Sequence, residues 1–156
     1  MSETPWLDTQ EEDAWRALQF MNMRLTTELA RDLARHSDLA YQDYVVLVAL
    51  TDQPDGMLRL YELAERLGWE RSRLSHHISR MAGRGLIEKR KCPSDRRGAL
   101  VVATDHGRSV IGSAAPSHAA AVRRFFIDLL TPAQLASLAD AANTVLAALG
   151  SQAGQD

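Results

Sequence analysis

Apolar residues recur at helical spacing over most of the 156-residue chain, and only residues 86–103 have the pattern of a strand pair. We expect five helices, separated by short polar breaks, at about 11–35, 60–67, 71–83, 104–130 and 131–149. The strands are expected at 86–92 and 99–103, with residues 93–98 as the loop between them. This order predicts a mainly α-helical fold with a small β-hairpin.

Residues 41–50, YQDYVVLVAL, are ambiguous. A short apolar run with β-branched residues fits either a buried strand or a buried helix. The tight turn DQPDG follows at once, and a helical pattern comes after it. This context favours a helix.

Two helix starts are marked by capping residues. Residues 104–105 (Thr-Asp) can cap the long helix that follows them. Residues 131–134 (TPAQ) supply a Thr N-cap, a Pro at the first helical position and a Gln three residues after the cap. Gly107, Gly112 and Pro116 predict that the first half of the helix after Thr104 is weak or kinked.

Residues 60–107 carry the most specific pattern. A short amphipathic helix ends at Gly68, a helix rich in Arg, Ser and His follows, and a basic hairpin comes next. In the second helix Leu74, Ile78 and Met81 must face inward, and the opposite face presents Ser72, His76 and Ser79. Such a helix can rest on its own domain and bring small hydrogen-bonding side chains into the major groove of DNA.

The charge distribution supports a nucleic-acid partner although the net charge of −2 does not. Residues 66–97 contain ten Lys and Arg and three Asp and Glu, a local charge of +7, and the remainder carries −9. A merely solvated charged face is the alternative interpretation. The helix-turn-helix pattern makes duplex DNA the favoured partner.

The hairpin offers a second contact. Arg96 and Arg97 can reach an adjacent minor groove, where negative potential attracts guanidinium groups. Asp95 would repel phosphate and is expected to hold a neighbouring arginine; an ordinary polar turn is the alternative.

The residues predicted to contact DNA are Arg71, Ser72, Arg73, Ser75, His76, Arg80, Arg84, Lys91, Asp95, Arg96 and Arg97. Among them, Arg73 and His76 are expected to reach base edges, and Arg80 and Arg84 to contact phosphates.

Residues 63–107 resemble the multiple-antibiotic-resistance regulator (MarR) family through LAERLG, RSRLSHHISRMAGRGLIEKR, PSDRRG and VATDHGR. The resemblance extends more weakly over the whole chain. It implies a winged helix-turn-helix protein that forms an obligate, triangular homodimer, intertwined through its N- and C-terminal helices, on a pseudo-palindromic operator. The chain is then one MarR-like domain, residues 1–156, with dimerisation helices at 11–36 and 106–150 and the winged helix-turn-helix at 38–105.

A dimer is also expected on physical grounds. The terminal helices have wide apolar faces and no second core to cover them, so a monomer would expose that surface to water. A two-fold dimer also places two short helices on half-sites about one turn of DNA apart.

The resemblance further implies an effector cleft between the dimer helices and the winged domain, taking small phenolic or aromatic acids. The candidate lining residues are Trp15, Phe20, Met23, Tyr41 and Tyr44. For each one taken singly, a core or interface role is the favoured alternative. We therefore expect a ligand-responsive repressor, with a constitutive DNA-binding regulator or a winged-helix protein-interaction module as alternatives.

Other functional classes find little support. The sequence has no G-x-S-x-G, P-loop, H-E-x-x-H or Gly-rich dinucleotide turn, so we expect neither an enzyme nor a cofactor. His76 and His77 are adjacent and diverge on a helix, so no metal site is expected there.

The chain is expected in the cytoplasm. It has no long apolar run and an acidic N-terminus without a signal-peptide pattern. Its one cysteine, Cys92, cannot form an internal disulfide, which suits a reducing compartment. A redox switch at Cys92 is less favoured than an inert strand cysteine, because no second cysteine can resolve it.

Overall fold

The computed structural model describes residues 5–152, except for the side chains of residues 95–97 and 151–152. The chain divides into two compact units. The central unit consists of residues 27–119, and the terminal unit of residues 1–26 and 120–156.

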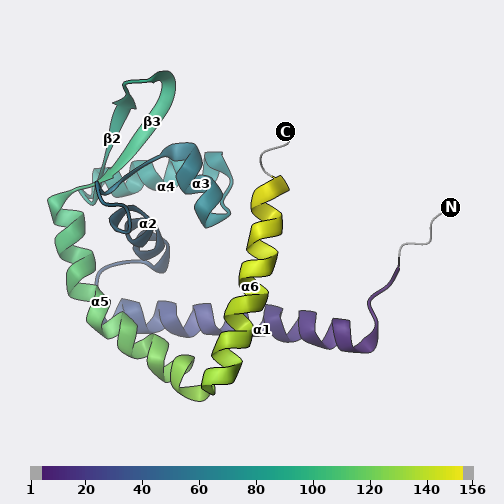
Figure 1. Cartoon of the computed structure of the whole chain (residues 1–156). Helices are drawn as coiled ribbons and strands as arrows, with labels where there is room; N and C mark the ends of the chain where they lie inside the picture. The colour runs from purple at the N-terminus through teal and green to yellow at the C-terminus, as the bar shows by residue number, and fades with distance from the viewer. Residues whose placement is uncertain (1–4, 153–156) are drawn as a thin grey trace. The chain divides into compact units, whose positions relative to one another are not determined.

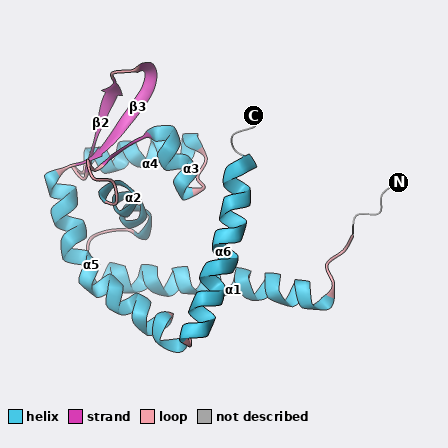
Figure 2. Ribbon diagram, viewed as in Figure 1, coloured by secondary structure: helices cyan, strands magenta, loops and turns pink. Residues whose placement is uncertain are grey.

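Helices make up most of the chain (Figures 1 and 2). The elements are α1 Thr9–His36, α2 Tyr41–Thr51, β1 Met57–Arg59, α3 Leu60–Leu67, α4 Arg71–Gly83, β2 Ile87–Cys92, β3 Asp95–Ala103, α5 Asp105–Phe125, the 3-10 turn η1 Ile127–Leu129, and α6 Pro132–Gln152. The ambiguous segment 41–50 is therefore a helix, α2, as its context predicted. Within residues 5–152, every helix is too short or too polar to span a lipid bilayer.

The sheet is antiparallel with strand order β1-β3-β2. Strand β1 was not predicted, because three residues are too few to show an alternating pattern; it pairs with β3 from Met57 to Arg59. The predicted loop at 93–98 is wrong, since β3 begins at Asp95 and only Pro93 and Ser94 connect the two longer strands. The start of β3 was missed because residues 95–98 are polar, and the arm of an extended hairpin need not have an apolar face (Figure 2).

The core of the central unit includes buried side chains of α2, α3, α4, the sheet and α5. Val46, Leu47 and Leu50 of α2 are fully buried. The three apolar residues predicted to face inward from α4, Leu74, Ile78 and Met81, are also fully buried. Each such side chain contributes roughly 1.5–3 kcal/mol through burial, so this core fixes which face of α4 remains outside.

The turn between α3 and α4 depends on Gly68. Its φ of +64° lies in the left-handed region, where glycine is favoured. The Trp69 amide donates to the Ala64 carbonyl at 2.9 Å, and the Gly68 amide donates to the Glu65 carbonyl at 3.2 Å. These bonds end α3, and α4 begins after three connecting residues, 68–70.

The start of α5 is capped as predicted. The Thr104 hydroxyl accepts a hydrogen bond from the Gly107 amide at 3.0 Å and donates to the Gly85 carbonyl at 2.6 Å. A Cβ at Gly107 would overlap the carbonyl oxygen of Leu86, so close backbone approach explains this glycine. The helix continues without a break through Gly112 and Pro116.

The start of α6 has the predicted capping box. The Gln134 side chain accepts from the Thr131 amide at 2.9 Å, and the Thr131 hydroxyl accepts from the Gln134 amide at 3.2 Å. In contrast to the central unit, residues 5–24 and most of α6 are exposed in the single chain.

Candidate nucleic-acid interface

Helix α4 presents a cationic outer face. Opposite its buried residues it exposes Arg71, Ser72, Arg73, His76 and Arg80. Ser75 is half-buried, and its carbonyl accepts the Ser79 hydroxyl at 3.0 Å. The structure thus brings the predicted α4 residues onto one accessible surface, while their individual contacts with DNA stay predictions.

Two aromatic rings hold the arginines at the start of α4. The Arg73 guanidinium carbon lies 4.7 Å from the centre of the Trp69 ring, and that of Arg71 lies 6.0 Å from the centre of the Tyr61 ring. A cation–π contact orders a guanidinium without neutralising its charge. Sequence reasoning missed Trp69 and Tyr61; the available signal was aromatic residues close to the glycine turn before a basic helix.

Polar contacts join the β2–β3 hairpin to α4 and to β1. Lys89 Nζ donates to the Ser79 hydroxyl at 2.6 Å, and Arg59 Nη2 donates to the Ser94 hydroxyl at 2.8 Å. Ser79, predicted on the open face of α4, is therefore engaged with the hairpin. The thiol of Cys92 is buried and lies 3.3 Å from the Ser94 hydroxyl.

The predicted hairpin contacts are only partly described. Lys91 is exposed on β2. The side chains of Asp95, Arg96 and Arg97 lie outside the described part of the structure, so their roles stay predictions.

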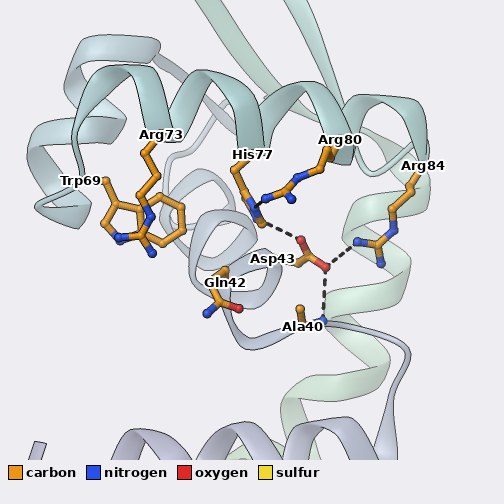
Figure 3. A pocket seen from close by; sticks show the side chains of 8 residues that line it. All are labelled: Ala40, Gln42, Asp43, Trp69, Arg73, His77, Arg80 and Arg84. Carbon is orange, nitrogen blue, oxygen red and sulfur yellow. Dashed lines mark hydrogen bonds and ion pairs between the residues drawn. The ribbon is translucent and has the colours of Figure 1, made fainter. Parts of the chain in front are cut away.

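On its other flank α4 meets a buried carboxylate on α2 (Figure 3). Asp43 is 1% exposed. Its Oδ2 accepts from Arg84 Nη1 at 2.6 Å and from the Ala40 amide at 3.2 Å, and its Oδ1 lies 3.0 Å from His77 Nε2. We call Asp43, His77 and Arg84 the Asp43 cluster. Arg84, predicted to contact phosphate, thus has a partner inside the protein.

The imidazole of the Asp43 cluster favours its neutral form. Burial lowers the pKa of His77 below its ordinary value of 6.5. The Asp43 carboxylate opposes this effect, while the nearby charges of Arg80 and Arg84 add to it. Arg80 Nη2 lies 3.2 Å from His77 Nδ1, so the neutral ring can accept from Arg80 there and direct its Nε2 proton toward Asp43. The Nε2–H bond is not aligned on the carboxylate, so this contact is close without being a full hydrogen bond.

Two of the five predicted ligand-binding residues line a common cavity. Tyr41 and Tyr44 border a space of about 370 Å³ together with His118 of α5, whose ring centre is 4.3 Å from that of Tyr44. Burial raises the pKa of both phenols and lowers the pKa of His118. Sequence reasoning did not connect His118 with this site, because 74 residues separate it from Tyr44.

The other three predicted ligand-binding residues do not line this cavity. Trp15, Phe20 and Met23 belong to the terminal unit, and each side chain is more than half exposed in the single chain. Among the described residues, no group of three or more His, Cys, Asp or Glu could hold a metal ion.

Known proteins share this architecture. The sequence model of the MarR family matches residues 37–98. The chain is similar to AbsC of Streptomyces coelicolor, a MarR family transcriptional regulator, with 39% identity, a TM-score of 0.85, and coverage of 95% of this chain and 99% of that one. This chain belongs to the MarR family. No curated protein matches it in sequence.

Two further solved structures are similar. Sco3205 of Streptomyces coelicolor, a MarR family regulator solved in complex with DNA, is 36% identical, with a TM-score of 0.84 and coverage of 94% of this chain and 91% of that one. BpsR of Bordetella bronchiseptica, whose DNA binding is regulated by 6-hydroxynicotinic acid, is 22% identical, with a TM-score of 0.74 and coverage of 91% and 97%. At that identity the second likeness shows the fold alone.

Membership of the MarR family defines the general function. The chain is a DNA-binding transcriptional regulator with a winged-helix fold. Regulators of this family are generally not enzymes. The α3–α4 pair and the β2–β3 hairpin are the helix-turn-helix and wing of this MarR-type protein.

Proposed function

We propose that this protein is a homodimeric repressor that binds a pseudo-palindromic operator and releases it when a small aromatic ligand binds. The observation that carries the DNA-binding part is the outer face of α4, where Arg71, Arg73 and Arg80 surround His76. Buried apolar residues fix this face outward, so it can enter a major groove.

In this proposal α4 and the hairpin make different contacts with DNA. On α4, His76 and Arg73 contact base edges. The DNA backbone is contacted by four further residues of α4 and one of the hairpin: Arg71, Ser72, Ser75, Arg80 and Lys91. Arg96 and Arg97 at the hairpin contact the minor groove, with Asp95 orienting them. The complex of Sco3205 with DNA supports this use of the fold.

The dimer is supported by the exposed apolar side chains of the terminal unit. Trp15 and Phe20 are 54% and 60% exposed, and Val145, Leu146 and Leu149 of α6 are 57–62% exposed. An apolar surface of this kind in a single chain marks a protein interface. We propose that residues 11–36 and 106–150 form the dimer contact and residues 38–105 the DNA-binding part of one MarR-like domain.

Ligand response is supported by the cavity beside Tyr41 and Tyr44. Two phenols and the imidazole of His118 can stack on and hydrogen-bond to a small aromatic acid. Regulation of BpsR by 6-hydroxynicotinic acid shows that a protein of this fold can be controlled by such a compound. A ligand that favours the released state by roughly 1–3 kcal/mol changes operator occupancy usefully.

Binding assays with selected DNA test the central claim. The preferred site would be selected from random duplexes, and its affinity compared with that of scrambled DNA over a range of salt concentrations. A regulator should bind the selected site more tightly by roughly 10³-fold or more, with affinity falling steeply as salt rises. Equal affinity for both DNAs would leave a winged-helix interaction module as the better assignment.

A screen of aromatic acids tests the switch. Compounds that raise the melting temperature would be added to the protein bound to its selected site. Release of DNA by a stabilising compound, abolished in a Tyr44→Ala variant, would support a ligand-responsive regulator. If every stabilising compound left DNA affinity unchanged, a constitutive regulator would remain.

A further inference from the structure

The two sides of α4 are held to the central unit in different ways. On the inner side Leu74, Ile78 and Met81 are fully buried in the core. On the side facing the start of α2 lies a cavity of about 420 Å³, bridged by polar side chains (Figure 3). Apolar burial sets which face of α4 is outward, but because it is not directional it determines small rotations of the helix about its own axis less well than hydrogen bonds do.

Asp43 contacts α4 on the open side. Its Oδ2 accepts a directional hydrogen bond from Arg84, which caps the C-terminal end of α4, and its Oδ1 lies against His77 Nε2, about two helical turns earlier. One carboxylate therefore contacts the recognition helix at two positions along its length. Because an unpaired buried carboxylate is costly, these contacts must form whenever α2 and α4 are packed.

We propose that Asp43 is a positioning residue for DNA recognition, which sets the orientation of the base-reading face of α4 through His77 and Arg84 without touching DNA. This inference rests on the proposed role of α4 in reading bases. It assigns Arg84 an inward function, since Nη1 donates to Asp43 and Nη2 donates to the Asp38 carbonyl at 3.3 Å.

The proposal separates two kinds of DNA binding. Base readout requires side chains in correct geometry, so a small rotation of α4 weakens it. Contacts with phosphates require mainly cations on the surface, and Arg71, Arg80 and Lys91 remain there when the carboxylate is lost. Loss of Asp43 should therefore reduce discrimination between sequences more than it reduces affinity for random DNA.

The test compares Asp43→Asn, Arg84→Gln and the double variant with the wild-type protein. Affinity for the selected site and for random DNA would be measured over a range of salt concentrations, with circular dichroism to confirm folding. Each single variant should lower the ratio of specific to random affinity at least about fivefold. The double variant should lose no more than the worse single variant, because both changes remove one interaction.

Arg90→Gln is the matched control. Arg90 is a hairpin cation paired with Glu88 at 3.1 Å, with both side chains about half exposed. It lies in the same basic region but outside the Asp43 cluster, so its removal should leave the affinity ratio unchanged. Arg84→Gln also serves as the second variant if Asp43→Asn fails to fold, since the Arg84 side chain is 47% exposed.

Two results would overturn the proposal. If Arg84→Gln weakens binding to both DNAs equally and reduces the salt slope by about one, Arg84 is a phosphate contact. If Asp43→Asn lowers the melting temperature but leaves the affinity ratio unchanged, the carboxylate only stabilises the fold. A wild-type protein with no sequence preference would instead contradict the proposed function itself.

Discussion

The central and terminal units contain the same kinds of apolar residue but differ in how far a single chain buries them. The central unit buries Leu47, Leu50 and Leu63 completely within one chain. In the terminal unit Leu146 and Leu149 are 62% and 57% exposed. The winged helix therefore buries its own core within one chain, and the exposed apolar side chains of the terminal helices are what the proposed dimer would cover.

Removing a buried leucine from the central unit should have the largest effect. Leu47→Ala leaves a cavity in the centre of the core and should cost about 2–5 kcal/mol of unfolding free energy. Urea unfolding at a fixed protein concentration measures this loss. The matched Leu146→Ala change removes the same atoms from the terminal unit, and its cost should fall when the protein is diluted. A cost for Leu47→Ala that also depended on dilution would remove the distinction between the units.

A charged side chain introduced into the terminal unit should weaken dimer formation without unfolding the central unit. Leu146→Glu places a carboxylate in the proposed dimer contact and should raise the dissociation constant at least tenfold, about 1.4 kcal/mol. Sedimentation at micromolar concentration would detect the monomer. Because the proposed operator has two half-sites, one for each protomer, affinity for the selected site should fall as the dimer dissociates. A wild-type protein that sediments as a monomer would rule out the dimer.

Removing the two predicted helix caps, one in each region of the chain, should cause smaller losses of unfolding free energy. Thr104→Ala removes both a cap of α5 and the hydroxyl's hydrogen bond to Gly85, so it should cost about 2 kcal/mol. Thr131→Ala removes a cap at the exposed start of α6 and should cost about 1 kcal/mol. Thermal unfolding of both variants gives the comparison. Replacement by Ser at either position retains the hydroxyl and should restore most of the loss.

Features encoded locally could be predicted from the sequence, and features formed between distant segments could not. The caps at Thr104 and Thr131 and the inward face of α4 follow from residues within one or two turns. Strand β1 could not be predicted, because its three residues form a strand only through pairing with β3, more than 40 residues later in the chain.

The Asp43 cluster could not be predicted from the sequence for the same reason. In the sequence Asp43 is an acid in the first turn of a helix, which the helix dipole alone would explain. Its contact with Arg84 joins residues 41 positions apart. Only the packing of α2 beside α4 shows that this carboxylate is buried and contacts the recognition helix.

The smallest expected effect is a pH dependence confined to the central unit. Burial lowers the pKa of His77 and His118 below the ordinary value of 6.5. The unfolded chain therefore binds protons at a pH where these two folded side chains remain neutral, and the free energy of unfolding should fall as pH decreases from about 7 to 5. Above pH 7 both states are neutral and the contribution is constant.

Substitution of His118, whose ring is half-buried, should flatten this profile. His118→Gln removes one of the two groups, so stability should fall less steeply below pH 7 than in the wild-type protein. His76→Gln is the matched control, because His76 is exposed on α4. Urea unfolding between pH 5 and 8 measures all three profiles. Parallel profiles for His118→Gln and the wild-type protein would show that burial of this histidine in the central unit has no energetic consequence for folding.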